Sequence, residues 1–152
     1  MKNEALIIYG SSKGRTARIA QQIGQAFAES DITYTLKNVF EARPEELSQY
    51  AFVILGSSTY GQGDLQRDFL DFERGMDDLD LTSIHGAVFG SGNSRYTYFA
   101  EAVDILEAKI KILNGRLLLP SLKQDMMEGS PDSPDVTQWI QELVRLIKDF
   151  RP

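Results

Sequence analysis

Short apolar segments alternate with amphipathic helical patterns along almost the whole chain. Strand-like runs are expected at residues 5–9, 32–36, 52–55, 87–89 and 117–119. Helical periodicity predicts helices at about residues 15–29, 44–49, 64–78, 97–113 and 134–150. Strands separated by helices are typical of a parallel sheet with helices on both faces and right-handed crossovers. The sequence therefore predicts a doubly wound α/β fold with five parallel strands, and its 152 residues suit one domain over residues 1–152.

The composition narrows the classes of function. No run approaches the roughly 20 apolar residues of a membrane-spanning helix, so we expect no membrane association. The net charge of −6 argues against nucleic acid as a partner, because such binding needs clustered cations. The chain has no cysteine, so any redox chemistry would belong to a bound organic cofactor. A strand is expected within the first residues, which leaves no room for a signal peptide and favours a cytoplasmic location.

The segment between the first strand and the first helix, residues 10–16, is typical of a phosphate-binding loop. It is rich in small and hydroxylated residues, and the following helix would direct its free N–H groups and positive dipole end at the same point. The same composition suits turns and helix caps, so a purely structural loop is the alternative. The spacing of Gly10 and Gly14 matches neither a Walker A loop nor the three-glycine dinucleotide fingerprint, which favours a mononucleotide.

Two further loops are expected at the same edge of the sheet, because the carboxyl ends of parallel strands meet there. The third strand runs into residues 56–64 and the fourth into residues 90–99. Each loop combines glycines with an aromatic side chain, Tyr60 in the first and Tyr96 in the second. Ligands of such sheets bind at this edge, where the strand order reverses. The three loops together suit a flat aromatic ring with a phosphate tail.

These loops resemble those of the flavodoxins, and the similarity covers essentially the whole chain. The motifs that carry it are Ser11-Ser12-Lys13-Gly14-Arg15-Thr16, Thr59-Tyr60-Gly61-Gln62 and Gly90-Ser91-Gly92-Asn93-Ser94-Arg95-Tyr96-Thr97-Tyr98-Phe99. The resemblance implies a flavodoxin-like sheet with strand order 2-1-3-4-5 and FMN as the cofactor. It also implies an electron carrier that shuttles single electrons between the semiquinone and hydroquinone states to low-potential partner enzymes, and not an enzyme. The short segment between Leu122 and the last helix indicates a short-chain member.

The resemblance also implies which residues bind the cofactor. Tyr60 and Tyr96 would stack on the two faces of the flavin ring, and the carbonyl of Gly61 would turn toward the reduced flavin. The implied cofactor-binding residues are Ser11, Ser12, Lys13, Gly14, Arg15, Thr16, Ser58, Thr59, Tyr60, Gly61, Gln62, Ser91, Gly92, Asn93, Tyr96, Tyr98 and Phe99. The chain carries no cluster typical of a metal site.

Four residues depart from the family pattern. Gln62 and Asn93 stand where flavodoxins usually have aspartate, so we expect a less negative potential for the second electron than in members with both acids. Lys13 and Arg15 add positive charge to the phosphate loop, which short-chain members usually build from neutral donors. These two cations either strengthen phosphate binding or lie on the surface.

Residues 64–80 carry seven carboxylates and two arginines, a local balance of −5. Redox partner proteins are expected to dock electrostatically near Asp64, Asp68 and Asp71, although such a helix face can also serve solubility alone. We expect a monomer.

Three alternative functions are an FMN-dependent NAD(P)H or quinone oxidoreductase of the same fold, a receiver-like signalling domain, and a binding protein of this fold that has lost its flavin. The receiver is disfavoured because Tyr9-Gly10-Ser11 stands where it needs acids.

Overall fold

The computed structural model describes residues 2–10, 14–60, 64–65, 67–93, 100–127 and 129–150, with the backbone alone for residues 2, 3, 60, 64, 65, 67 and 68. Within these residues one sheet contains seven strands, β1 (Lys2–Gly10), β2 (Tyr34–Asn38), β3 (Tyr50–Tyr60), β4 (Asp64–Leu65), β5 (His85–Gly92), β6 (Arg116–Leu117) and β7 (Leu122–Asp125). The α-helices are α1 (Arg15–Glu29), α2 (Arg67–Gly75), α3 (Glu101–Ile112) and α4 (Pro134–Asp149). Short 3-10 helices follow β2, namely η1 (Val39–Glu41) and η2 (Pro44–Gln49).

The predicted fold and strand order are confirmed. The main path through the sheet is β2-β1-β3-β5-β6, and all of its pairs are parallel. β1 pairs with β2 on one side and β3 on the other, with Ile7 opposite both Leu36 and Ile54. The order therefore reverses between β1 and β3, which places the expected ligand edge at the carboxyl ends of these strands.

The predicted fifth strand, residues 117–119, is wrong in its bounds. β6 ends at Leu117 and pairing with β5 resumes only at Leu122, in β7. Pro120 lies in the gap and has no N–H to donate to a neighbouring strand. Its carbonyl instead accepts a 2.8 Å hydrogen bond from the Trp139 indole. The last strand is therefore interrupted, and its second half pairs with the carboxyl end of β5.

Two other predicted elements need correction, and a third is described only in part. The helix expected at residues 64–78 is preceded by β4, which pairs antiparallel with β3, and α2 itself spans Arg67–Gly75. The short helix expected at residues 44–49 is present but is a 3-10 helix. The predicted helix at residues 97–113 corresponds to α3, and residues 97–99 lie outside the described residues.

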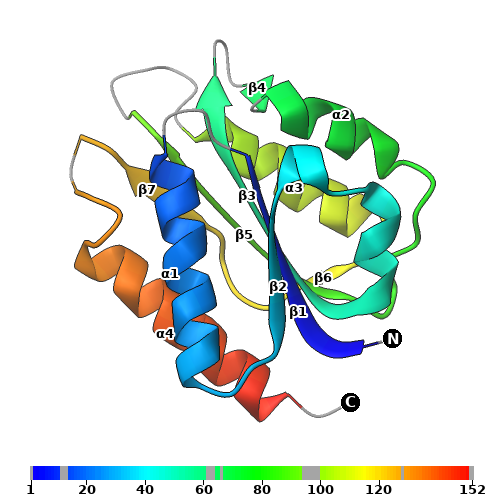
Figure 1. Ribbon diagram of the computed structural model, residues 1–152. Coiled ribbons are helices and arrows are strands. Elements are labelled where there is room, and N and C mark those ends of the chain that lie inside the picture. Colours follow the sequence, from blue (N-terminus) through cyan, green and yellow to red (C-terminus); the bar gives the residue numbers. More distant parts are fainter. Residues whose placement is uncertain are drawn as a thin grey trace.

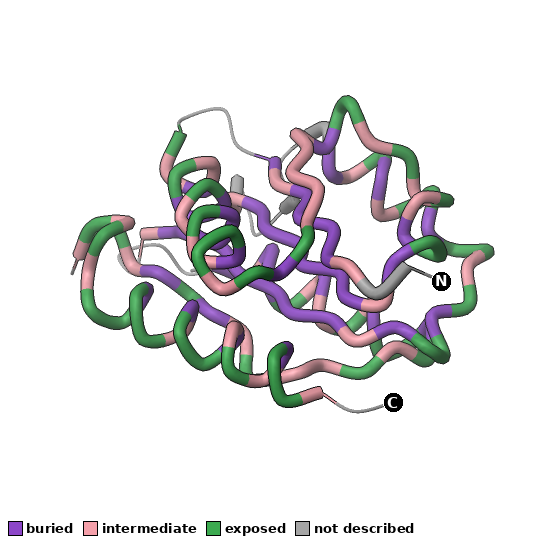
Figure 2. Tube along the Cα trace, turned by 60° about the horizontal axis from the view of Figure 1, so that its bottom comes forward, coloured by how far each residue is buried: buried purple, intermediate pink, exposed green. Residues whose placement is uncertain are grey.

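Each face of the sheet has its own hydrophobic core, because alternate strand residues point to opposite faces. Leu6 and Ile8 of β1 pack toward α2 and α3, where Phe69 and Leu106 are fully buried. The intervening residues of β1 pack toward α1 and α4. Figure 1 shows these two pairs of helices on opposite sides of the sheet, and Figure 2 shows that the buried residues are concentrated in the strands between them. None of the described helices is long and apolar enough to cross a bilayer.

The single histidine, His85, begins β5 at the edge opposite the expected ligand site. Its ring packs against Phe150, with centroids 4.5 Å apart, and lies near Phe52. Burial lowers the pKa of His85 below its ordinary value near 6.5, and the positive charge of the neighbouring Arg116 lowers it further. The folded protein therefore favours the neutral imidazole.

This shift makes stability depend on pH in a definite direction. Since the unfolded chain binds the His85 proton at a higher pH than the folded chain, the contribution is fully present above about pH 6.5 and is lost as the pH falls through the folded pKa. Urea unfolding at pH 7.5 and 5.5 should show a greater loss of stability in the wild type than in His85→Gln. The apoprotein must be used, because phosphate monoesters titrate near pH 6. Equal losses in the two proteins would contradict this assignment.

Candidate functional site

Three hydroxyl groups meet where the expected ligand edge begins. The Thr16 Oγ1 atom, in the first turn of α1, lies 2.9 Å from Ser58 Oγ and 3.1 Å from Ser91 Oγ. Ser58 and Ser91 lie opposite each other on β3 and β5, so the cluster joins one residue from each of the three predicted loops. Thr16 and Ser91 are buried. A hydroxyl can accept two hydrogen bonds and donate one, so Thr16 has a hydrogen left for an anion when both serines donate to it.

The start of α1 suits an anion. Gly14 precedes the helix with φ 86°, a conformation that favours glycine, and its Cβ position has no atom within 4 Å. The first turn of α1, residues 15–18, contains no acidic residue. The N–H groups of a helix start and its dipole stabilise negative charge. The backbone, the helix dipole and the Thr16 hydroxyl therefore form a donor set that fits a phosphate monoester.

Arg15 makes contacts that the sequence did not indicate. Its Nη1 atom donates to Gln124 Oε1 at 3.0 Å and to the carbonyl oxygen of Gly129 at 3.2 Å. Both acceptors belong to β7 and the loop after it, and Arg15 is partly buried. Arg15 thus links the start of α1 to the last strand. The sequence did not single out Gln124, although a polar residue at an inward position of a short strand was a signal that could have identified it.

The second predicted loop begins next to α3. The Thr59 Oγ1 atom accepts a 3.0 Å hydrogen bond from the N–H of Ala102, in the first turn of α3. Ala100, directly before that helix, has a left-handed backbone with φ 49°. Gly90 of β5 lies so close to β3 that a Cβ there would be 2.5 Å from the Ser57 carbonyl oxygen. The strand ends at this edge are therefore closely packed around small residues.

Of the predicted cofactor-binding residues, the structure brings Gly14, Arg15, Thr16, Ser58, Thr59, Ser91, Gly92 and Asn93 to this edge. The backbone of Tyr60 ends β3 at the same edge. The remaining ones lie outside the described residues, namely Ser11, Ser12, Lys13, Gly61, Gln62, Tyr96, Tyr98 and Phe99.

Only part of the acidic segment at residues 64–80 carries charge that is available to a partner. Lys109 of α3 is mostly buried and bridges Glu73, at 3.0 Å, and Asp77. Although burial alone would lower the pKa of Lys109, hydrogen bonds to Asp77 and Glu73 raise it overall, so it stays charged. Asp80 accepts hydrogen bonds from Thr82. Asp71 is exposed on α2, and the side chains of Asp64 and Asp68 are not described.

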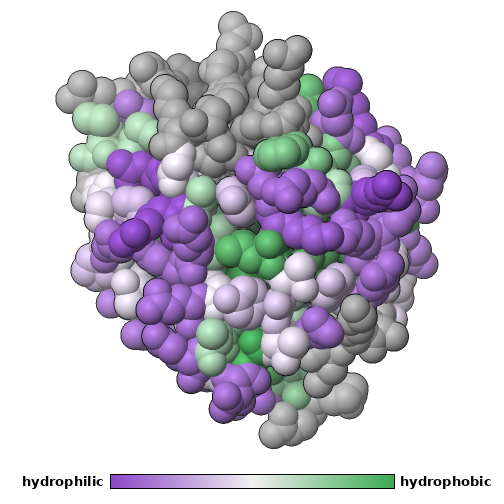
Figure 3. All heavy atoms as spheres, viewed as in Figure 1, coloured by the Kyte–Doolittle hydropathy of each residue, from purple (hydrophilic) through white to green (hydrophobic). Residues whose placement is uncertain are grey.

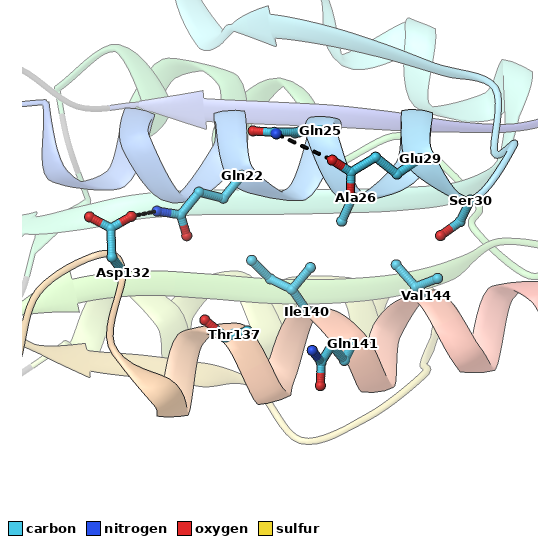
Figure 4. A pocket seen from close by; sticks show the side chains of 10 residues that line it. All are labelled: Gln22, Gln25, Ala26, Glu29, Ser30, Asp132, Thr137, Ile140, Gln141 and Val144. Atoms are coloured by element: carbon cyan, nitrogen blue, oxygen red, sulfur yellow. Dashed lines mark hydrogen bonds between the residues drawn. The ribbon is translucent and has the colours of Figure 1, made fainter.

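A separate groove of about 420 Å³ lies between α1 and α4. Figure 4 shows Gln22, Gln25 and Glu29 of α1 along one side and Ile140, Gln141 and Val144 of α4 along the other. Asp132 lies at one end and accepts a hydrogen bond from Gln22. The groove is lined by helices rather than by strand ends, and it is distinct from the site described above.

Comparison with known proteins gives a consistent result. The sequence matches the family model described as Flavodoxin over residues 7–139. It is 35% identical over 140 residues to a flavodoxin of Maridesulfovibrio salexigens, covering 90% of this chain and 94% of the relative. It is also 35% identical to probable flavodoxin 2 of Bacillus subtilis, covering 95% and 92%. The crystal structure of oxidised flavodoxin 1 from Bacillus cereus superposes with a TM-score of 0.89 at 33% identity, covering 97% of this chain and 99% of that one.

Proposed function

Because this chain belongs to the flavodoxin family, whose members bind FMN and carry electrons, we propose that it shuttles single electrons between a reductase and low-potential acceptor enzymes. The observation that carries the proposal is the meeting of Thr16, Ser58 and Ser91 at the carboxyl edge of the sheet, beside the point where the strand order reverses. This edge joins a phosphate-type helix start to the two strand ends from which ring-binding loops would leave. Flavodoxins are electron carriers and not enzymes, so family membership does not support the alternative of an NAD(P)H or quinone oxidoreductase.

The residues divide into two groups in this proposal. Residues 11–16 would hold the phosphate with backbone N–H groups and hydroxyls, supported by the positive end of α1. Residues 58–62 and 91–99 would hold the ring, with Tyr60 and Tyr96 stacked on its faces. When bound, FMN supplies the one-electron chemistry, and the protein sets the potential through the charge and hydrogen-bond donors that it places near the ring.

Stepwise reduction distinguishes a one-electron carrier from a two-electron enzyme. The FMN-loaded protein is titrated with a reductant under anaerobic conditions while visible spectra are recorded. A one-electron carrier is expected to accumulate a form distinct from both the oxidised and the fully reduced flavin. Direct passage between those two forms, or rapid turnover of NADH or NADPH by the isolated protein, would contradict the proposal. Failure to bind FMN would contradict it at an earlier step.

The charge near the ring sets the potential of the second electron, because full reduction adds negative charge. Asn93→Asp and Gln62→Asp should each lower that potential by some tens of millivolts, where about 59 mV corresponds to a tenfold change in relative affinity. Gln141→Glu makes the same charge change in the groove between α1 and α4, and should alter the potential much less. Spectroelectrochemical midpoints measure all three variants. A potential that stays constant or rises in the two aspartate variants would overturn this assignment.

The flavodoxin role implies redox partner proteins, and we propose that they dock near Asp64, Asp68 and Asp71. The exposure of Asp71 supports this, since Glu73 and Asp77 are occupied by Lys109. Electron transfer to cytochrome c, a basic one-electron acceptor, should slow as ionic strength rises. It should also be slower in Asp71→Asn than in Glu29→Gln, an exposed carboxylate variant on α1. Rates that are independent of salt, or equal in the two variants, would argue against this surface.

We also propose that the carrier acts as a monomer. On the described part of the face seen in Figure 3, hydrophilic side chains surround separate apolar groups of limited size. Stable homodimer interfaces are usually larger and more apolar. Sedimentation of the FMN-loaded protein should give a single species of about 17 kDa, against the 17.1 kDa of the chain. The cytoplasmic location stays a prediction.

A further inference from the structure

The contact of Arg15 fixes a segment that the sequence did not connect with the site. Gln124, one acceptor of the Arg15 guanidinium, is only 1% exposed and lies opposite Ser91 in the pairing of β7 with β5. Gly129, the other acceptor, donates its own N–H to the Asp125 carbonyl oxygen at 3.2 Å. Both hydrogens on Nη1 are therefore directed at neutral carbonyl oxygens, one in β7 and one in the loop after it.

The same segment is bonded to the end of β5. The Met126 N–H donates to the Gly92 carbonyl oxygen at 2.9 Å, and Gly92 lies opposite Asp125 in the register. Gly92 and Asn93 lead directly into the loop proposed to carry Tyr96. Figure 1 shows the start of α1 beside β7. A continuous set of contacts thus runs from the phosphate end of the site, through Arg15 and residues 124–126, to the ring end.

We propose that Arg15 is a positioning residue: it holds Gln124 and Gly129 against the start of α1 and thereby fixes the end of β5 in the place that ring binding requires. The inference rests on the proposed flavin site. This role differs from that of a phosphate ligand, because the guanidinium acts through Gln124 and Gly129. It also differs from the role of a solvated surface cation, because breaking a charge-assisted hydrogen bond to a buried acceptor costs free energy.

Riboflavin distinguishes these roles, because it has the ring of FMN without the phosphate. Apoprotein is titrated with FMN and with riboflavin, by loss of flavin fluorescence, at about 0.5 M salt, where the screening length is roughly 4 Å. Arg15→Gln should lower the affinity for both ligands by a similar factor, about tenfold. The matched control is Arg18→Gln, which removes the same charge one turn further along α1, where the arginine is exposed and pairs with Asp132 at 3.2 Å. It should leave both affinities within about twofold.

The other end of the contact gives an independent test. Gln124→Leu leaves the charge of Arg15 in place but removes its buried acceptor. It should therefore weaken riboflavin binding, as Arg15→Gln does. The double variant should bind riboflavin no more weakly than Arg15→Gln alone, since Arg15→Gln already removes the contact that Gln124→Leu removes. In the apoprotein, hydrogen exchange of the Gly92 and Met126 amides should be faster in Arg15→Gln than in Arg18→Gln, a readout that needs no flavin.

Four results would contradict either the role of Arg15 or the proposed function. Loss of FMN affinity alone, with riboflavin unchanged, would make Arg15 a phosphate ligand and overturn the inference. Unchanged affinity for both ligands, or additive effects in the double variant, would also overturn it. Wild-type apoprotein that binds neither flavin would contradict the proposed function instead, and that result is visible before any variant is compared.

Discussion

Gly90→Ala is expected to lower the free energy of unfolding of the apoprotein by about 3 kcal/mol and to weaken FMN binding strongly. A Cβ at this position would lie 2.5 Å from the Ser57 carbonyl oxygen and 2.6 Å from Cγ2 of Val103. The first contact is with the backbone of the paired strand, and Val103 is fully buried in α3. The first contact can be relieved only if β3 moves away from β5, and the second only if α3 shifts outward. The movement of β3 would separate Ser58 from Ser91, where the hydroxyl cluster is formed.

The same strand supplies the control. In Gly86→Ala the new methyl would lie 3.1 Å from Cδ1 of Ile110, the far end of a flexible side chain, and 3.5 Å from the nearest backbone oxygen. We expect Gly86→Ala to change stability by less than about 1 kcal/mol, because a small shift of Ile110 relieves the contact. Urea denaturation of both apoproteins measures the difference. Equal stability of the two variants would show that the close approach of β3 and β5 does not restrict the residue at position 90.

The alternation of strands and helices was accessible from the sequence because the periodicity changed clearly between them, whereas the order of the strands in the sheet was expected only from the resemblance to flavodoxins. Apolar runs such as residues 5–8 are buried on both faces, as central parallel strands are, and α1 shows its apolar residues at helical spacing. The division of the last strand into β6 and β7 was not accessible in this way. Pro120 gave a local signal, but only the register with β5 shows where pairing resumes.

The residues at the ligand edge could be predicted from the sequence, but the contacts between them could not. Loop composition identified Thr16, Ser58 and Ser91 as ligand-edge residues, but their mutual contacts depend on how far α1 and the strands extend. Arg15 illustrates the limit. Its position in a phosphate-type loop indicated an anion or solvent, whereas its acceptors lie 109 and 114 residues further along the chain. Contacts of that sequence separation are set by topology and cannot be deduced from the local pattern.

Thr16→Val is expected to lower the free energy of unfolding of the apoprotein by about 1 to 3 kcal/mol and to weaken FMN binding by about tenfold or more. Valine keeps the shape of threonine but removes the hydroxyl that lies between Ser58 and Ser91. Ser91 is buried, so it would lose a partner that water does not readily replace. Thr16→Ser keeps the hydroxyl and loses only a methyl group, so it should retain most of the FMN affinity.

The double variant Thr16→Val with Ser91→Ala tests whether the hydroxyls act together. Removing both partners of a buried hydrogen bond costs less than removing one, because no unsatisfied group remains. The double variant should therefore be less destabilised than the sum of the two single variants, as measured by urea denaturation. Strict additivity would show that the two hydroxyls contribute independently, and the phosphate and ring ends of the site would then not be joined through Thr16. A similar non-additivity in the FMN affinities would show that the same link acts in cofactor binding, since Thr16 lies in the first turn of α1 and Ser91 directly before the last residue of β5.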